Sequence, residues 1–164
     1  RLPKNGGVVM VTFVPSFDSK AIREWEKKFE AFKPVNPVDS QDARRQRQEW
    51  RKQNPAPQAT LQDVADHIDH VRKVAGVDHV GIGSDFDGID TTPVGLQDVS
   101  TFPVLFAELI RRGWSDADLK KLSRGNILRV LKQAEAVAAQ LQKTTRPSVR
   151  TIEELDGAAK PATP

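Results

Sequence analysis

The chain has 164 residues, 38% hydrophobic and 29% charged, which places it among soluble globular proteins and suffices for one domain of ordinary size. Its formal net charge of +3 is modest, so a general affinity for nucleic acid is not indicated. The absence of cysteine excludes a disulfide framework and thiolate chemistry.

The chain begins at Arg1 without an initiator Met, and it holds no uninterrupted apolar run long enough to span a bilayer. We therefore expect an internal piece of a longer protein, with no transmembrane segment. The first strand is predicted over residues 6–13, a short β-branched run that is entered through a glycine pair. Such a run is typical of a strand that is buried on both faces.

An inserted helical hairpin is predicted at about residues 18–57. Its first helix covers residues 19–32, where one apolar stripe lies on an otherwise charged surface. Pro34 and Pro37 end that helix, and a second, highly charged helix is expected over residues 39–52. The large apolar residues of the two helices, which should pack against a partner, are Ile22, Trp25, Phe29, Phe32 and Trp50.

Helices then alternate with a second strand. Thr60 and Asp63 resemble a capping box at the start of a third helix, and Gly76 is its expected stop. A second buried strand is predicted over residues 79–86, and strands separated by helices favour a parallel sheet. We therefore predict an α/β fold in which helices cover a parallel sheet or barrel. Further helices are predicted over residues 102–112, 116–123 and 126 to about 142.

The end of the chain, residues 144–164, is a polar stretch with several prolines and few large apolar residues. Such a stretch cannot bury enough apolar surface to offset the entropy lost on ordering. We expect a loose, flexible C-terminal tail that follows a single domain of residues 1–143.

The candidate catalytic residue is Asp85, which follows the second predicted strand among small residues. In parallel α/β folds, active sites are built at the C-terminal edge of the strands. A carboxylate in a partly dry pocket at that edge can acquire a pKa suited to proton transfer. Capping of the strand end is an equally good structural interpretation of the same residue.

Other polar residues nearby favour structural roles. Asp87 precedes a glycine, and this pair is a turn signal in which the aspartate bonds its own backbone. His67 and His70 superficially resemble a metal pair, but a helical wheel places His70 opposite the apolar face and His67 at its flank. The glutamate of a His-Glu-x-x-His zinc motif is missing, so we assign no metal ligand to this chain.

Several linked motifs occur in order. They are Asn-Gly-Gly-Val-Val-Met-Val-Thr-Phe at residues 5–13, the helix at residues 64–76, Val-Gly-Ile-Gly-Ser-Asp-Phe-Asp-Gly at residues 80–88, and the segments 95–100, 109–115 and 125–130. Together they resemble the membrane (renal-type) dipeptidases, peptidase family M19. The resemblance covers most of residues 4–135 apart from the hairpin.

This resemblance implies a (β/α)8 TIM-type barrel of the metal-dependent amidohydrolase kind, to which the chain contributes the C-terminal portion, the last two βα units. It also implies a site with two zinc ions, whose histidine, aspartate and glutamate ligands lie on strands upstream of residue 1. The implied activity is hydrolysis of dipeptides by a metal-bridging hydroxide. We therefore expect the isolated chain to be inactive.

The family's last-strand aspartate falls on Asp85, which by resemblance shuttles the proton during attack on the peptide carbonyl and contacts the substrate. Phe13 and Val14 fall in a region that borders the substrate pocket of the family, so they are candidate substrate contacts. Packing at the barrel rim explains Phe13 equally well.

The chain departs from the family pattern at residues 16–58, which are longer and more charged than the family's loop. Loops that follow barrel strands lie on the active-site face, so this insertion is expected to cover the site, narrow substrate choice or form a homodimer contact. Two alternatives stay open: a barrel that acts on another amide or ester, and a non-catalytic fragment that binds a partner through the basic hairpin. An exported or periplasmic location agrees with the resemblance, but the sequence does not fix the compartment.

Overall fold

The computed structural model describes residues 1–33 and 40–157. By its internal contacts the chain divides into two units, Arg1–Val130 and Leu131–Pro164. Pro34, Pro37 and the expected start of the second hairpin helix at Asp39 lie outside the described residues.

Two parallel strands form the sheet, which confirms the predicted α/β arrangement. Strand β1 (Val9–Thr12) pairs with β2 (Val80–Ser84). Val9 lies opposite Val80, and an irregularity after Val11 brings Thr12 opposite Ser84. Both strands are shorter than expected. A short helix, α1 (Leu2–Asn5), precedes β1, and its cap Gly6 has a φ of 73° that delays the start of the strand.

Helix α5 (Leu61–Ala75) covers the sheet and begins where the capping box predicts. The Thr60 side chain accepts a hydrogen bond from the Asp63 amide, and the Asp63 carboxylate accepts one from the Thr60 amide. Leu61, Val64, Ile68 and Val71 form its buried face. That face shares one core with residues of the sheet and the later helices, namely Val11, Phe13, Val80, Leu96, Leu105, Leu109, Trp114 and Leu122.

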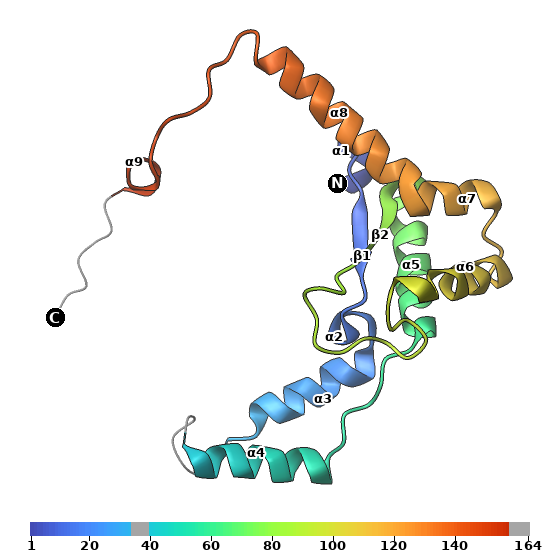
Figure 1. Cartoon of the computed structure of the whole chain (residues 1–164), viewed down its shortest axis with the longest axis vertical. Helices are drawn as coiled ribbons and strands as arrows, with labels where there is room; N and C mark the ends of the chain where they lie inside the picture. Colours follow the sequence, from blue (N-terminus) through green and yellow to red (C-terminus); the bar gives the residue numbers. More distant parts are fainter. Residues whose placement is uncertain (34–39, 158–164) are drawn as a thin grey trace. The chain divides into compact units, whose positions relative to one another are not determined.

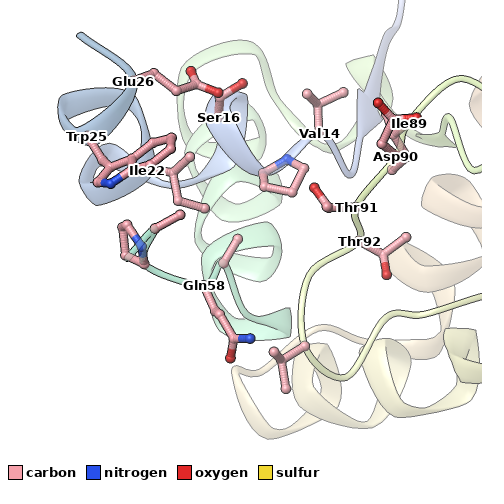
Figure 2. A pocket seen from close by; sticks show the side chains of 15 residues that line it. Val14, Ser16, Ile22, Trp25, Glu26, Gln58, Ile89, Asp90, Thr91 and Thr92 are labelled. Atoms are coloured by element: carbon pink, nitrogen blue, oxygen red, sulfur yellow. The ribbon is translucent and has the colours of Figure 1, made fainter. Parts of the chain in front are cut away.

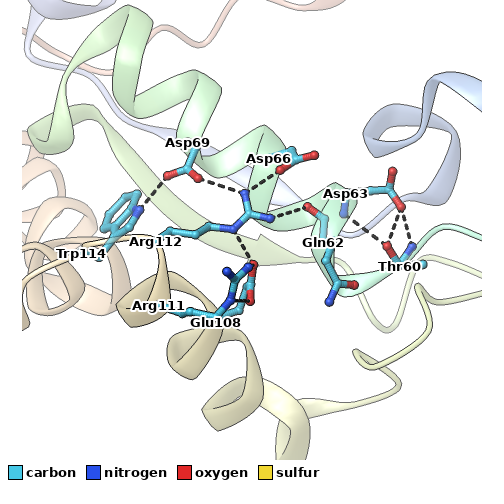
Figure 3. A network of polar contacts seen from close by, with 9 residues as sticks. All are labelled: Thr60, Gln62, Asp63, Asp66, Asp69, Glu108, Arg111, Arg112 and Trp114. Carbon is cyan, nitrogen blue, oxygen red and sulfur yellow. Dashed lines mark hydrogen bonds and ion pairs between the residues drawn. The ribbon is translucent and has the colours of Figure 1, made fainter.

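Charged hydrogen bonds join α5 to α6 (Phe102–Arg111) and the turn behind it (Figure 3). The Arg112 guanidinium donates to Glu108 at 2.6 Å and to Asp69 at 3.0 Å, and it also pairs with Asp66. The indole N–H of Trp114 donates to the other oxygen of Asp69 at 2.7 Å. These bonds fix the register of α6 on the outer face of α5.

The predicted hairpin consists of α3 (Lys20–Ala31) and α4 (Gln41–Gln53), which follow the short helix α2 (Pro15–Asp18) (Figure 1). The apolar stripe of α3 packs against Trp50 of α4. The ring centroids of Trp25 and Phe29 lie 5.6 and 5.3 Å from that of Trp50. The stripe therefore finds its partner within the hairpin itself.

The remaining elements are mostly short helices and turns. They are two 3-10 turns (Val77–His79 and Val99–Thr101), α7 (Asp116–Lys120), a π-helical turn (Lys121–Gly125), α8 (Asn126–Leu141) and α9 (Ile152–Asp156). Asn126 is buried and its amide donates to the carbonyls of Val77 and Val80, at 2.7 and 2.8 Å, which ties the start of α8 to the entrance of β2. Over the residues described, no helix combines the length and apolar character needed to cross a membrane.

Candidate functional site

The two strands end at the same edge of the sheet, where the sequence places the candidate site. The Phe13 amide donates to the Ser84 carbonyl at 2.8 Å, so the pairing continues to the last residue before Asp85. Parallel strands bring their C-terminal residues together at one edge. Phe13, Val14 and Asp85 therefore lie at the same edge of the sheet, with the Phe13 side chain in the core.

Phe13 packs in the core beneath the C-terminal edge of the two strands. Its side chain is fully buried, and its ring makes edge-to-face contacts with Phe86 and Phe102 at centroid distances of 5.6 and 5.9 Å. Such pairs of aromatic rings stabilise a defined geometry. The ring thus anchors the segment that follows Asp85, while a direct contact of Phe13 with substrate stays a prediction.

The backbone at Asp85 is unusual. Ser84 and Asp85 have φ angles of 47° and 72°, and among the described residues they are the only positions other than glycine with positive φ. The Asp85 amide donates to the Gly83 carbonyl at 2.7 Å, and the Asp85 carbonyl accepts from the Gly88 amide at 3.0 Å. Left-handed backbone at residues with side chains costs about 1–3 kcal/mol each and is concentrated at functional sites.

The Asp85 carboxylate lies directly over Gly88. A Cβ placed on Gly88 would stand 2.5 Å from Oδ1 of Asp85, so a larger residue there would require this carboxylate to shift. Asp85 is exposed, and in the described part of the chain its carboxylate makes no hydrogen bond or ion pair. The carboxylate is therefore accessible to a bound molecule.

A cavity of about 740 Å³ opens beside the segments that follow the two strands (Figure 2). Val14 follows β1 and Ser16 lies in α2, and Ile89 to Thr92 follow the turn that carries Asp85. Trp25 and Glu26 of α3 form another part of the wall. The volume lies within the range of small-molecule sites.

Asp18 is a buried acid that no sequence pattern singles out. Its side chain is 0% exposed, and His67 Nδ1 lies 2.9 Å from its Oδ1. Burial raises the pKa of Asp18 to about 6, against the lowering effect of His67. Oδ2 has no hydrogen-bond partner among the described residues. The contact spans 49 residues of sequence, so no local signal announces it.

The described residues do not fit a metal centre on their own. Within residues 1–33 and 40–157, no group of three or more histidine, cysteine or carboxylate side chains converges on a point that could hold a metal ion. His67 and Asp18 form a pair only, and His79 lies at the other end of β2, where its Nδ1 is 2.7 Å from the Gly7 carbonyl. His70 is exposed on the far side of α5.

Comparison with known proteins gives a consistent answer. The model of the family described as membrane dipeptidase (peptidase family M19) matches residues 1–145. Dipeptidase verJ of Clonostachys rogersoniana is 49% identical over 94 residues, which are 57% of this chain and 24% of that protein. Dipeptidase 3 of Rattus norvegicus is 52% identical over 79 residues, 48% of this chain and 16% of that protein.

The solved structures that resemble this chain are also peptidases. The probable dipeptidase PvdM of Pseudomonas aeruginosa has a TM-score of 0.59 at 30% identity, over 78% of this chain and 37% of its own. A metallopeptidase of Rhodobacter sphaeroides, liganded with a phosphinate mimic of the dipeptide L-Ala-D-Ala, has a TM-score of 0.55 at 27% identity. That match covers 80% of this chain and 28% of the other. The chain thus spans a quarter or less of the curated relatives named above.

Proposed function

Since the chain belongs to the membrane dipeptidase family, peptidase family M19, we propose that the protein of which it is part is a metallo-dipeptidase that hydrolyses the peptide bond of dipeptides. The match of the family model over residues 1–145 is the observation that carries this proposal. The similar metallopeptidase of Rhodobacter sphaeroides is liganded with a mimic of a dipeptide, which supports a dipeptide as the substrate.

The fold proposed for the whole protein is a (β/α)8 barrel in which β1 and β2 are the last two strands. The parallel pairing of these strands and the cover of α5 agree with two consecutive βα units. The solved dipeptidases align with most of this chain but with only 28–37% of their own length. The missing strands would then belong to the part of the protein outside these 164 residues.

The metal ligands, too, are proposed to lie in the part of the protein outside these 164 residues. Because the described residues form no metal centre, we propose that the ligands of the metal, which we expect to be zinc, lie on the remaining strands. A bound metal of this kind would polarise the peptide carbonyl and make water more acidic. The residues of this chain would then supply proton transfer and substrate contacts.

Asp85 is proposed to move the proton in this reaction. Its carboxylate is exposed and unpaired among the described residues, at the C-terminal edge of the strands, which is where a barrel places its catalytic groups. As a general base it would accept the proton of the attacking water, and as a general acid it would return a proton to the leaving amine. A positioned acid or base of this kind contributes about 10²–10⁴-fold in rate.

Replacement of Asp85 in the full-length protein tests the proposal. Asp85→Asn is expected to lower kcat for a dipeptide by about 10²–10⁴-fold while the metal content stays at the wild-type level. Asp87→Asn is the matched control, because Asp87 is exposed on the same turn and has no polar partner among the described residues. Wild-type turnover by Asp85→Asn would remove this residue from the mechanism.

A further inference from the structure

The cavity that opens at the segments after β1 and β2 has a wall that the hairpin provides. One side is formed by the segments after β1 and β2, and the other by Ile22, Trp25 and Glu26 of α3 together with residues 56–59 behind α4 (Figure 2). The sequence predicts that the hairpin departs from the family pattern. We therefore expect the hairpin to shape this cavity differently from the corresponding region of other family members.

Trp25 gives the cavity a fixed aromatic surface. Its indole N–H donates to the Asn54 carbonyl at 2.7 Å, which ties α3 to the end of α4. Its ring also stacks on Phe29, with an interplanar angle of 8° and centroids 5.6 Å apart. A tryptophan held in this way presents apolar surface at little entropic cost, and its ring attracts cations.

Two carboxylates give the cavity its charge. Glu26 from α3 and Asp90 from the loop after β2 both line it, from opposite sides. Neither forms a hydrogen bond or an ion pair with any other described residue, and Glu26 is half-buried. The described lining contains no lysine, arginine or histidine that would neutralise them. A cleft lined by one sign of charge concentrates ligands of the opposite sign.

We propose that this cavity binds the ammonium or guanidinium group of a basic dipeptide side chain, which makes the enzyme selective for dipeptides that contain lysine or arginine. The inference rests on the proposed dipeptidase function. The aliphatic part of such a side chain packs on Trp25, Ile22 and Val14, and its charged end reaches Glu26 and Asp90. The hydroxyls of Ser16, Thr91 and Thr92 add acceptors for the remaining N–H groups.

The same chemistry disfavours acidic dipeptides. The side-chain carboxylate of an acidic dipeptide would lie near the like charges of Glu26 and Asp90 in a site partly shielded from water, where repulsion is stronger than in bulk solvent. Neutral side chains of equal length would gain the apolar contacts alone. The order of preference is therefore basic, then neutral, then acidic.

Matched substrates and the full-length protein test the inference. The kcat/KM for Ala-Lys is compared with that for Ala-norleucine, which keeps the carbon chain but lacks the ammonium, and Lys-Ala is compared with norleucine-Ala. We expect the lysine dipeptide to be preferred about 10–100-fold in at least one of the two orders, as charged hydrogen bonds of about 1.5–3 kcal/mol would give. In the double variant Glu26→Gln, Asp90→Asn, the ratio of kcat/KM for the lysine dipeptide to that for the norleucine dipeptide should fall towards one. Glu30→Gln, an exposed change on the same helix, should keep it.

The outcomes separate this inference from the proposed function. Equal kcat/KM for the lysine and norleucine dipeptides in both orders, or an unchanged preference in the double variant, overturns the cation site and leaves the dipeptidase intact. If the protein cleaves no dipeptide, the proposed function fails, and calorimetric titration with L-lysine and L-norleucine decides about the cavity. Tighter binding of L-lysine that the double variant loses supports the site, whereas equal affinities reject it.

Discussion

His67 Nδ1 and Asp18 Oδ1 lie 2.9 Å apart and join the end of α2 to the middle of α5. Asp18 is the last residue of α2, just before the hairpin segment that starts at Ser19, so this contact fixes the point where the hairpin leaves α2. It does so with a carboxylate that is cut off from water and lacks a partner for its second oxygen among the described residues.

Replacement of Asp18 by asparagine should stabilise the protein at neutral pH. Burial raises the pKa of Asp18 from 3.8 to about 6, with His67 lowering it and Asp63 raising it further. Between these pH values the folded state keeps a proton that the unfolded state has lost, so the contribution of Asp18 to stability falls as pH rises towards 6. Urea unfolding of the full-length protein at pH 7.5 should show a gain of about 1–3 kcal/mol for Asp18→Asn.

The gain should shrink at pH 4.5, where the wild-type carboxyl is protonated in the folded state. Asp87→Asn, an exposed change, serves as the control and should leave the free energy of unfolding unchanged at both pH values. A loss of stability in Asp18→Asn that is equal at both pH values would contradict this interpretation.

Gly88→Ala should reduce activity without a large loss of stability. The added methyl group would stand 2.5 Å from Asp85 Oδ1, so the carboxylate has to move. A displacement of about 1 Å at a reacting group can cost about 10²-fold in rate. Steady-state kinetics of the full-length protein measure this loss. In an Asp85→Ala background, where no carboxylate is left to displace, the same substitution should cause no further loss, and an additive loss would show that Gly88 acts in another way.

Arg112→Lys should destabilise the fold more than Arg111→Lys. Both arginines bind Glu108, but the Arg112 side chain is 17% exposed and holds Asp66 and Asp69 as well, whereas Arg111 is 70% exposed. A lysine cannot reproduce the planar fork of donors. Chemical unfolding should give a loss of about 1.5–3 kcal/mol at position 112 and a clearly smaller loss at position 111. Equal losses would show that the network contributes little.

Trp50→Ala should loosen the hairpin and spare the sheet. The Trp50 ring contacts Trp25, Phe29 and Phe32, which is the main apolar contact between the two helices. Without it, amide hydrogen exchange should accelerate at least about tenfold in α3 and α4, while α5 keeps its protection. Acceleration that extends equally into α5 would mean that hairpin and sheet open as one unit.

The sequence predicts those parts of the fold that depend on neighbouring residues. The capping box of Thr60 and Asp63, the apolar stripe of the hairpin and the two β-branched runs each carry a local signal, and the structure confirms the corresponding helices and strands. The short helix α2 and the π-helical turn before α8 have no such signal. The contact between Asp18 and His67 depends on how α2 meets α5, and the left-handed backbone at Ser84 and Asp85 is uncommon for residues other than glycine.

That backbone has a consequence for attempts to make the protein more robust. Glycine or asparagine would adopt the conformation of residues 84 and 85 more easily, so a search for thermostable variants should repeatedly select substitutions there. At position 85, a stabilising substitution of this kind would remove the carboxylate that we propose to serve catalysis. One substitution at this residue would then raise thermal stability and lower turnover.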